Sequence, residues 1–145
     1  MSKKGGHDTK VLLERGEDFF PADLATKVPG AIFDIQQATR CIAFELPTAA
    51  GYHLHRANEA VLRRYWDVVT SGAAPPKNRA AALYLTEMEK KGVGDPKVIA
   101  ALRDLVKLHR NPLAHPDESL ESVNQAITLV GAINAVFVHM LKAIP

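Results

Sequence analysis

The sequence contains one cysteine, Cys41, in 145 residues, which excludes an internal disulfide and a zinc site built on several cysteines. It also lacks an excess of charge of either sign, because 18 lysines and arginines face 16 aspartates and glutamates. Proteins that coat a nucleic-acid duplex usually have a strong basic excess. The balance therefore argues against that class, although it leaves room for a local basic site.

Long apolar runs are scarce as well. The basic start MSKKGGHDTK is not followed by an apolar segment, so no secretory signal is expected. The most apolar stretch, residues 126–141, is interrupted by Thr128, Asn134 and His139 and is shorter than the roughly 20 residues that cross a bilayer. We interpret it as the core helix of a cytoplasmic protein without a membrane contact. The length and the 47% hydrophobic content are typical of one soluble domain.

Strands are not expected, because no run alternates apolar and polar residues between turn signals. Apolar spacing, prolines, glycines and capping residues instead predict helices. The first helix is expected between Pro29 and Pro47, and the second over 50–69 with Thr48 as its cap. The third is expected over 79–91, with Asn78 as its cap and Gly92 at its end. The fourth should run from Pro96 to about residue 110 with Asp95 as its cap, and the last from Asp117 or Ser119 to about residue 143. Short connections favour antiparallel neighbours, so the predicted fold is an all-α, up-and-down bundle of four to five helices. Residues 1–20 are expected to form a tail with a short helix, and 21–145 the single helical domain.

The segment LHRNPLAHPD, residues 108–117, holds the strongest candidate site. In a straight helix, positions five apart point roughly 140° away from each other. Pro112 breaks the helix and allows His115 to turn towards Arg110. Arginine offers a permanent charge that suits phosphate, and histidine transfers protons near neutral pH, so the pair suits phosphodiester chemistry. Spacing alone leaves open a simpler interpretation, in which Asn-Pro and His-Pro form turns and Arg110 solvates a helix end.

The residues RNPLAH, 110–115, resemble the signature of HEPN domains, the higher eukaryotes and prokaryotes nucleotide-binding helical bundles. In that signature an arginine and a polar residue precede a histidine, with four to six positions between the arginine and the histidine. Four intervene here, and the first is Asn111. The context is similar too, with the motif between the last two long helices and the segment HLHRANEAVLRRYW earlier. The resemblance covers about residues 30–143.

This resemblance implies a metal-independent endoribonuclease of toxin or defence type that needs no cofactor. The ribose 2′-hydroxyl would attack the neighbouring phosphate, with His115 as general base or acid and Arg110 stabilising the developing charge. Asn111 would orient the loop or the substrate. Some HEPN domains are not catalytic, so the alternative is a module that binds a nucleotide, RNA or a partner protein. Many HEPN toxins paired with a nucleotidyltransferase antitoxin have a tyrosine two residues after the histidine, where this chain has Asp117.

Three charged residues of the helix predicted over 50–69 are candidates to extend an RNA-binding surface: Arg56, Glu59 and Arg63. They are three, four and seven positions apart, which places them near one face. The alternative is a solvated helix face with a His55–Glu59 pair.

Other histidines are given simpler interpretations. A metal site of His53, His55 and Glu59 is rejected, because positions two apart diverge on a helix and no further ligand is apparent. His139 lies in an apolar segment and is expected to be a core histidine. Because apolar residues surround most of that last helix, we also expect a homodimer, which agrees with the dimeric habit of HEPN domains. An antitoxin or other protein partner is a further expectation of the resemblance.

Overall fold

The computed structural model describes residues 3–4, 7–108 and 122–145, and these form a helical bundle. The all-α fold class is confirmed. The α-helices in the described part of the chain are α1 (Thr9–Glu14), α2 (Leu24–Lys27), α3 (Ile32–Ala43), α4 (Pro47–Val69), α5 (Ala81–Lys91), α6 (Pro96–Leu108) and α7 (Val123–Ala143). Two short 3₁₀ helices, Gly16–Phe19 and Pro29–Ala31, lie before α2 and α3.

One small antiparallel pair departs from the expectation of no strand. β1 (Lys3–Lys4) pairs with β2 (His7–Asp8), with Lys3 opposite Asp8. Each strand has two residues, which is too short for an alternation of apolar and polar positions to be visible in the sequence. Asp8 then caps α1, because its Oδ1 accepts a hydrogen bond from the Lys10 amide at 2.8 Å.

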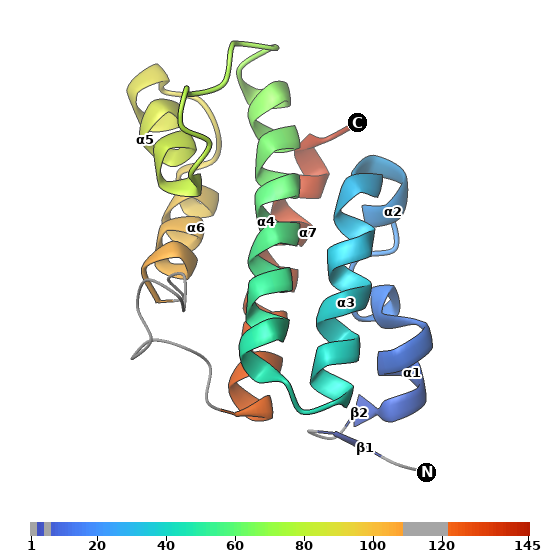
Figure 1. Cartoon of the computed structure of the whole chain (residues 1–145). Helices are drawn as coiled ribbons and strands as arrows, with labels where there is room; N and C mark the ends of the chain where they lie inside the picture. Colours follow the sequence, from blue (N-terminus) through green and yellow to red (C-terminus); the bar gives the residue numbers. More distant parts are fainter. Residues whose placement is uncertain (1–2, 5–6, 109–121) are drawn as a thin grey trace.

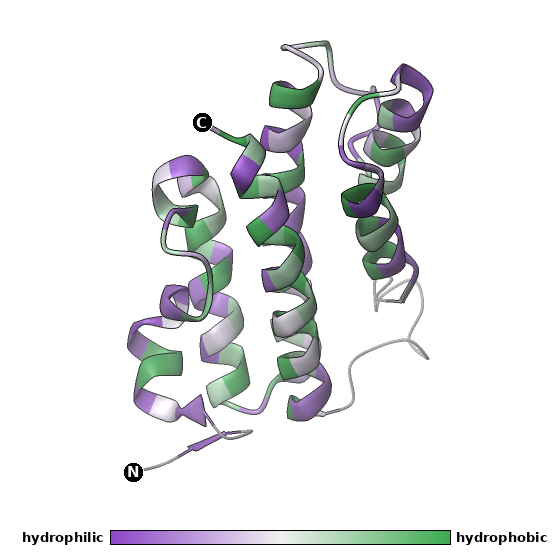
Figure 2. Cartoon of the chain, turned by 180° about the vertical axis from the view of Figure 1, so that it is seen from behind, coloured by the Kyte–Doolittle hydropathy of each residue, from purple (hydrophilic) through white to green (hydrophobic). Residues whose placement is uncertain are grey.

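The long helices α4 and α7 run side by side through the centre of the bundle (Figure 1). α3 packs on α4 and is flanked by α1 and α2, while α5 and α6 pair on the opposite side. The chain runs down α3, up α4, up α5, down α6 and up α7 (Figure 1). The helices α3, α4, α6 and α7 therefore alternate in direction as expected, whereas α5 runs parallel to α4 because the loop over residues 70–80 returns the chain before α5 begins. Viewed from behind, hydrophobic and hydrophilic residues alternate around the helices, as amphipathic packing requires (Figure 2).

Two groups of buried apolar side chains hold this arrangement. The larger joins α2 to α7 and includes Trp66, Tyr84 and Phe137, which are among the largest fully buried side chains. The smaller lies where α1 meets α3, α4 and α7, and it contains Leu12, Ile42, Ala43, Ala50 and Ala126. The first twenty residues therefore contribute Leu12 and Phe20 to buried clusters.

Helix ends follow the sequence signals in part. Gly92 ends α5 with a φ of 66°, and Asp95 accepts a hydrogen bond from the Lys97 amide at the start of α6, as predicted. The prediction that Thr48 caps α4 is wrong, because Pro47 already occupies the first helical turn and Leu46 is the flanking residue. Asn78 accepts a hydrogen bond from the Ala80 amide, but α5 begins only at Ala81.

The start and outer face of α7 also differ from expectation. Ser122 caps this helix, and its Oγ accepts from the Gln125 amide at 3.1 Å, whereas Asp117 and Ser119 lie outside the described residues. His139 is exposed, so the prediction of a core histidine is wrong. It lies on the side of α7 opposite the residues that pack inward, such as Ile133 and Phe137.

Within the described residues, α7 is the one helix whose length and composition would allow it to cross a membrane. In this fold it packs along α4, and seven of its side chains are buried. They are Ala126, Leu129, Ile133, Val136, Phe137, Met140 and Leu141. Packing in the core of the bundle therefore explains the apolar residues on one side of α7.

Candidate functional site

The motif residues Arg110, Asn111 and His115 lie outside the described residues. The structure gives their flanks: α6 ends at Leu108, and α7 begins at Val123. The end of α6 and the beginning of α7 both lie towards the end of the bundle at which α4 begins (Figure 1). The candidate residues of α4 are therefore the part of the predicted site whose geometry is known.

Arg56 projects from α4 onto a carboxylate of α3. Its Nε donates a hydrogen bond to Asp34 Oδ2 at 3.3 Å, and the other carboxylate oxygen lies 2.7 Å from His53 Nδ1. The Asp34 side chain is only 9% exposed, while that of Arg56 is 56% exposed. A buried carboxylate is costly unless it is paired, so these two donors explain how Asp34 is accommodated.

Tyr52 completes this group. The Arg56 guanidinium lies 5.6 Å from the centre of the Tyr52 ring, and its Nη1 donates to the Tyr52 hydroxyl at 3.2 Å. The hydroxyl and Asp34, in that order, raise the pKa of Arg56, and an arginine side chain is positively charged at neutral pH in any case. The Tyr52 ring also meets the His53 ring edge to face at 5.5 Å.

Glu59 and Arg63 form a second polar pair on α4. Arg63 Nη2 donates to Glu59 Oε2 at 3.3 Å, and both side chains are partly exposed. Burial raises the pKa of Glu59, while the positive charges of Arg63 and Arg56 act in the opposite direction. The structure thus keeps the three predicted residues in electrostatic contact, but it directs Arg56 to Asp34 and Arg63 to Glu59.

Some buried polar atoms on α4 and α7 have no hydrogen-bond partner in the described part of the chain. They are Asn58 Oδ1, Arg63 Nε and Asn134 Oδ1. Asn58 is 2% exposed, and an unsatisfied buried polar group costs about 1–3 kcal/mol. Such groups in a native fold call for a physical explanation, and here they lie on the two central helices.

No group of three His, Cys, Asp or Glu side chains in residues 3–4, 7–108 and 122–145 is arranged to hold a metal ion. His53, which the sequence suggested only as a rejected metal ligand, instead bonds to Asp34. The sequence interpretation missed Asp34 and Tyr52. The short connection between α3 and α4 was an available signal, because it makes the two helices antiparallel neighbours. Residue 34 of α3 then lies beside residues 53–56 of α4.

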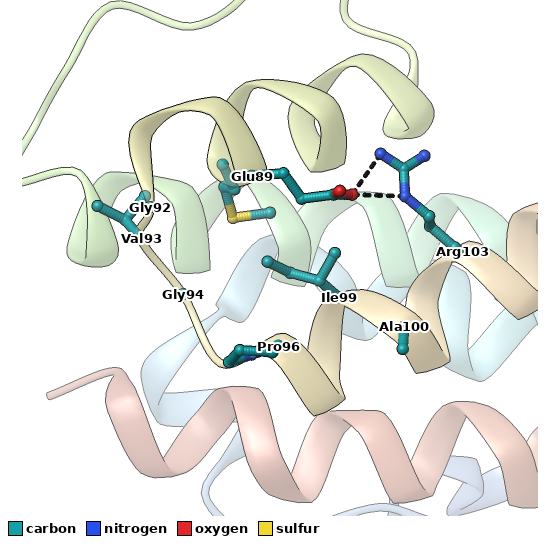
Figure 3. Close-up of a pocket in the computed structure, with 9 residues that line it drawn as sticks. Glu89, Gly92, Val93, Gly94, Pro96, Ile99, Ala100 and Arg103 are labelled. Atoms are coloured by element: carbon teal, nitrogen blue, oxygen red, sulfur yellow. Dashed lines mark hydrogen bonds and ion pairs between the residues drawn. The ribbon is translucent and has the colours of Figure 1, made fainter.

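A separate cavity of about 510 Å³ lies between α5 and α6 (Figure 3). Its lining is mostly apolar, with Met88, Val93 and Ile99, and an ion pair between Glu89 and Arg103 lies at its edge. Of the candidate site residues that the structure describes, none lines it, although the helix-end residues Gly92 and Pro96 do.

Comparison of the chain with protein-family models, with curated proteins and with solved structures finds no match. The functional interpretation therefore depends on the residues of the chain itself.

Proposed function

We propose that this protein is a metal-independent endoribonuclease of the HEPN type. The observation that carries the proposal is the sequence RNPLAH, residues 110–115, which stands between the last two long helices of an all-α bundle. The same order of helix, motif and helix is what the HEPN resemblance implies. The helical fold supports the proposal.

The proposed reaction is an internal transesterification. The 2′-oxygen of a ribose forms a bond to the adjacent phosphorus, and the bond from that phosphorus to the 5′-oxygen of the next nucleotide breaks. His115 accepts the 2′-hydroxyl proton or donates a proton to the departing 5′-oxygen, and Arg110 stabilises the negative charge that develops on the phosphate. Asn111 orients the loop or the substrate. The products are a 2′,3′-cyclic phosphate and a 5′-hydroxyl.

The positive charge on α4 supports an RNA substrate. The side chains of Arg56 and Arg63 are 56% and 43% exposed on the same helix. Arginine binds phosphate well because its planar fork of donors matches the phosphate oxygens. These residues would contact RNA beside the reacting phosphate, and Glu59 would hold Arg63 in place.

We also propose that the protein acts as a homodimer. The outer side of α7 leaves Val138 39% exposed and also exposes the small residues Gly131, Ala132 and Ala135. Small residues allow two helices to approach closely, so this side of α7 suits a second copy of the chain. An antitoxin or another protein is the alternative partner.

The test is cleavage of a labelled oligoribonucleotide by the purified full chain, with and without EDTA. The proposal expects equal cleavage in both conditions and a 2′,3′-cyclic phosphate at the new end. An oligonucleotide with 2′-deoxyribose at the cleaved position should stay intact. If RNA binds but remains whole, the protein is a non-catalytic binding module, and if EDTA abolishes cleavage and one divalent ion restores it, the mechanism is wrong.

A further inference from the structure

Asp34, Tyr52, His53 and Arg56 form a connected group, here called the Asp34 cluster. Of these four residues, Arg56 alone has a role in the function proposed above, as a contact for RNA. The Asp34 carboxylate can only accept, so His53 Nδ1 and Arg56 Nε both donate to it, at 2.7 and 3.3 Å. These two bonds turn one nitrogen of each side chain inward. His53 Nε2 and Arg56 Nη2 are the nitrogens that take no part in the contacts described for this cluster.

Several contacts restrict the Arg56 side chain. Asp34 engages both His53 and Arg56, and Arg56 also contacts the Tyr52 hydroxyl and ring. More than half of the Arg56 side chain is still exposed. Contacts that restrict a side chain before a ligand arrives lower the entropic cost of binding that ligand.

An aromatic ring lies beside this cation. The centre of the Tyr52 ring is 5.6 Å from the Arg56 guanidinium, and Tyr52 is 50% exposed. Single-stranded nucleic acids are recognised by this combination, since bases stack on aromatic rings or arginine planes while phosphates pair with cations.

We propose that the Asp34 cluster forms a binding site for single-stranded RNA. Arg56 and His53 contact a phosphate, and Tyr52 stacks against a base. The choice of RNA rests on the ribonuclease function proposed above, whereas the contacts of Arg56 and the exposed Tyr52 ring are features of the structure. An acidic peptide would use the positive charge but would leave the Tyr52 ring without a partner.

Binding is measured by fluorescence anisotropy with a labelled 2′-O-methyl oligonucleotide, which has no free 2′-hydroxyl and cannot be cleaved by the proposed reaction. Arg56→Gln is expected to weaken binding about tenfold, because it removes a charged hydrogen bond. Tyr52→Ala should weaken it about fivefold or more through lost stacking. Arg79→Gln removes one positive charge at an exposed position between α4 and α5, and it should change the affinity less than twofold.

Asp34→Asn separates an ordered site from simple attraction between charges. The substitution removes a negative charge at almost constant side-chain size, so long-range electrostatics alone would tighten the binding of an anion. If Asp34 orders Arg56 and His53, binding must instead weaken, by an amount similar to that of Arg56→Gln. Tighter or unchanged binding by a folded Asp34→Asn variant would overturn the proposal. If circular dichroism shows that the Asp34→Asn variant is unfolded, the affinities of the Arg56→Gln and Tyr52→Ala variants test the proposal instead.

Failure of this site and failure of the ribonuclease proposal are distinguishable. Cleavage of an ordinary oligoribonucleotide tests the enzyme, and anisotropy of the 2′-O-methyl probe tests the site. Unchanged affinity in Arg56→Gln and Tyr52→Ala would reject the site even if the protein cleaves RNA. Binding of poly-glutamate that depends on Arg56, together with no binding of the oligonucleotide, would reject it in favour of a protein partner.

Discussion

Gly16→Ala is expected to destabilise the fold, because the 3₁₀ helix that follows α1 packs directly on α3. A Cβ atom at Gly16 would lie 1.9 Å from Thr39 Oγ1 and 2.8 Å from Thr39 Cβ. Rotation of the Thr39 side chain cannot move its own Cβ, so the backbone has to shift. Overpacking of this kind costs about 1–3 kcal/mol, and disturbing the hydrogen bond from Thr39 Oγ1 to the Gln36 carbonyl adds about 1 kcal/mol. A loss of about 2–4 kcal/mol would lower the Tm by roughly 5–15 °C.

The assay is urea unfolding followed by the fluorescence of Trp66, the only tryptophan, which is 1% exposed. Gly30→Ala is the matched control, because a Cβ there meets no atom within 4 Å, and it should stabilise by about 0.4–1 kcal/mol or have no effect. The double variant Gly16→Ala/Thr39→Ala should recover part of the loss, since it removes the closest contact. A Gly16→Ala protein as stable as the wild type would refute the packing of this segment on α3.

Three further predictions concern association and titration. Light scattering at micromolar concentration should give a molar mass of twice the 15.8 kDa of one chain. Val138→Glu should reduce the measured mass to that of one chain. A monomeric wild-type protein would contradict the proposed dimer. Burial raises the pKa of Glu59 in the folded state above its value in the unfolded chain. The contribution of Glu59 to the free energy of unfolding is therefore lost as the pH rises through the folded-state pKa. Arg63→Gln should raise the pKa of Glu59 further in an NMR titration, and an unchanged value would show that the pair contributes little. Burial also raises the pKa of the Cys41 thiol, so iodoacetamide at pH 8 should react more slowly with the folded chain than with the urea-unfolded chain, and equal rates would disprove this.

The helices were predictable where strong local signals occur. The pair Asp95-Pro96 and the glycine at position 92 set helix ends that the structure confirms. Thr48 failed as a cap because Pro47 can itself occupy the first helical turn, so two local signals competed at the same place. His139 failed because an apolar helix has one side towards the core and one side away, and the sequence of a single helix does not say which side its partner covers.

The candidate site was predictable only in part, because it depends on contacts between helices. Arg56, Glu59 and Arg63 stand out by their spacing along one helix. The pair that the sequence suggested for Glu59 was with His55, whereas the structure shows an ion pair between Glu59 and Arg63, also four positions apart. Asp34 gives no local signal, since its partners are 19 and 22 residues away on another helix. Tertiary packing, which buries this carboxylate, decides its role.

The account is tested most directly by cleavage assays of Arg110→Ala and His115→Ala beside a matched control. Arg79→Ala removes the same residue type as Arg110→Ala at an exposed position outside the proposed sites. Loss of a general acid or base costs about 10²–10⁴ in rate, so both motif variants should lose most cleavage, while Arg79→Ala retains it and all three variants keep a Tm close to that of the wild type. Equal RNA cleavage by the wild type and both motif variants, in preparations free of contaminating nuclease, would contradict the catalytic assignment.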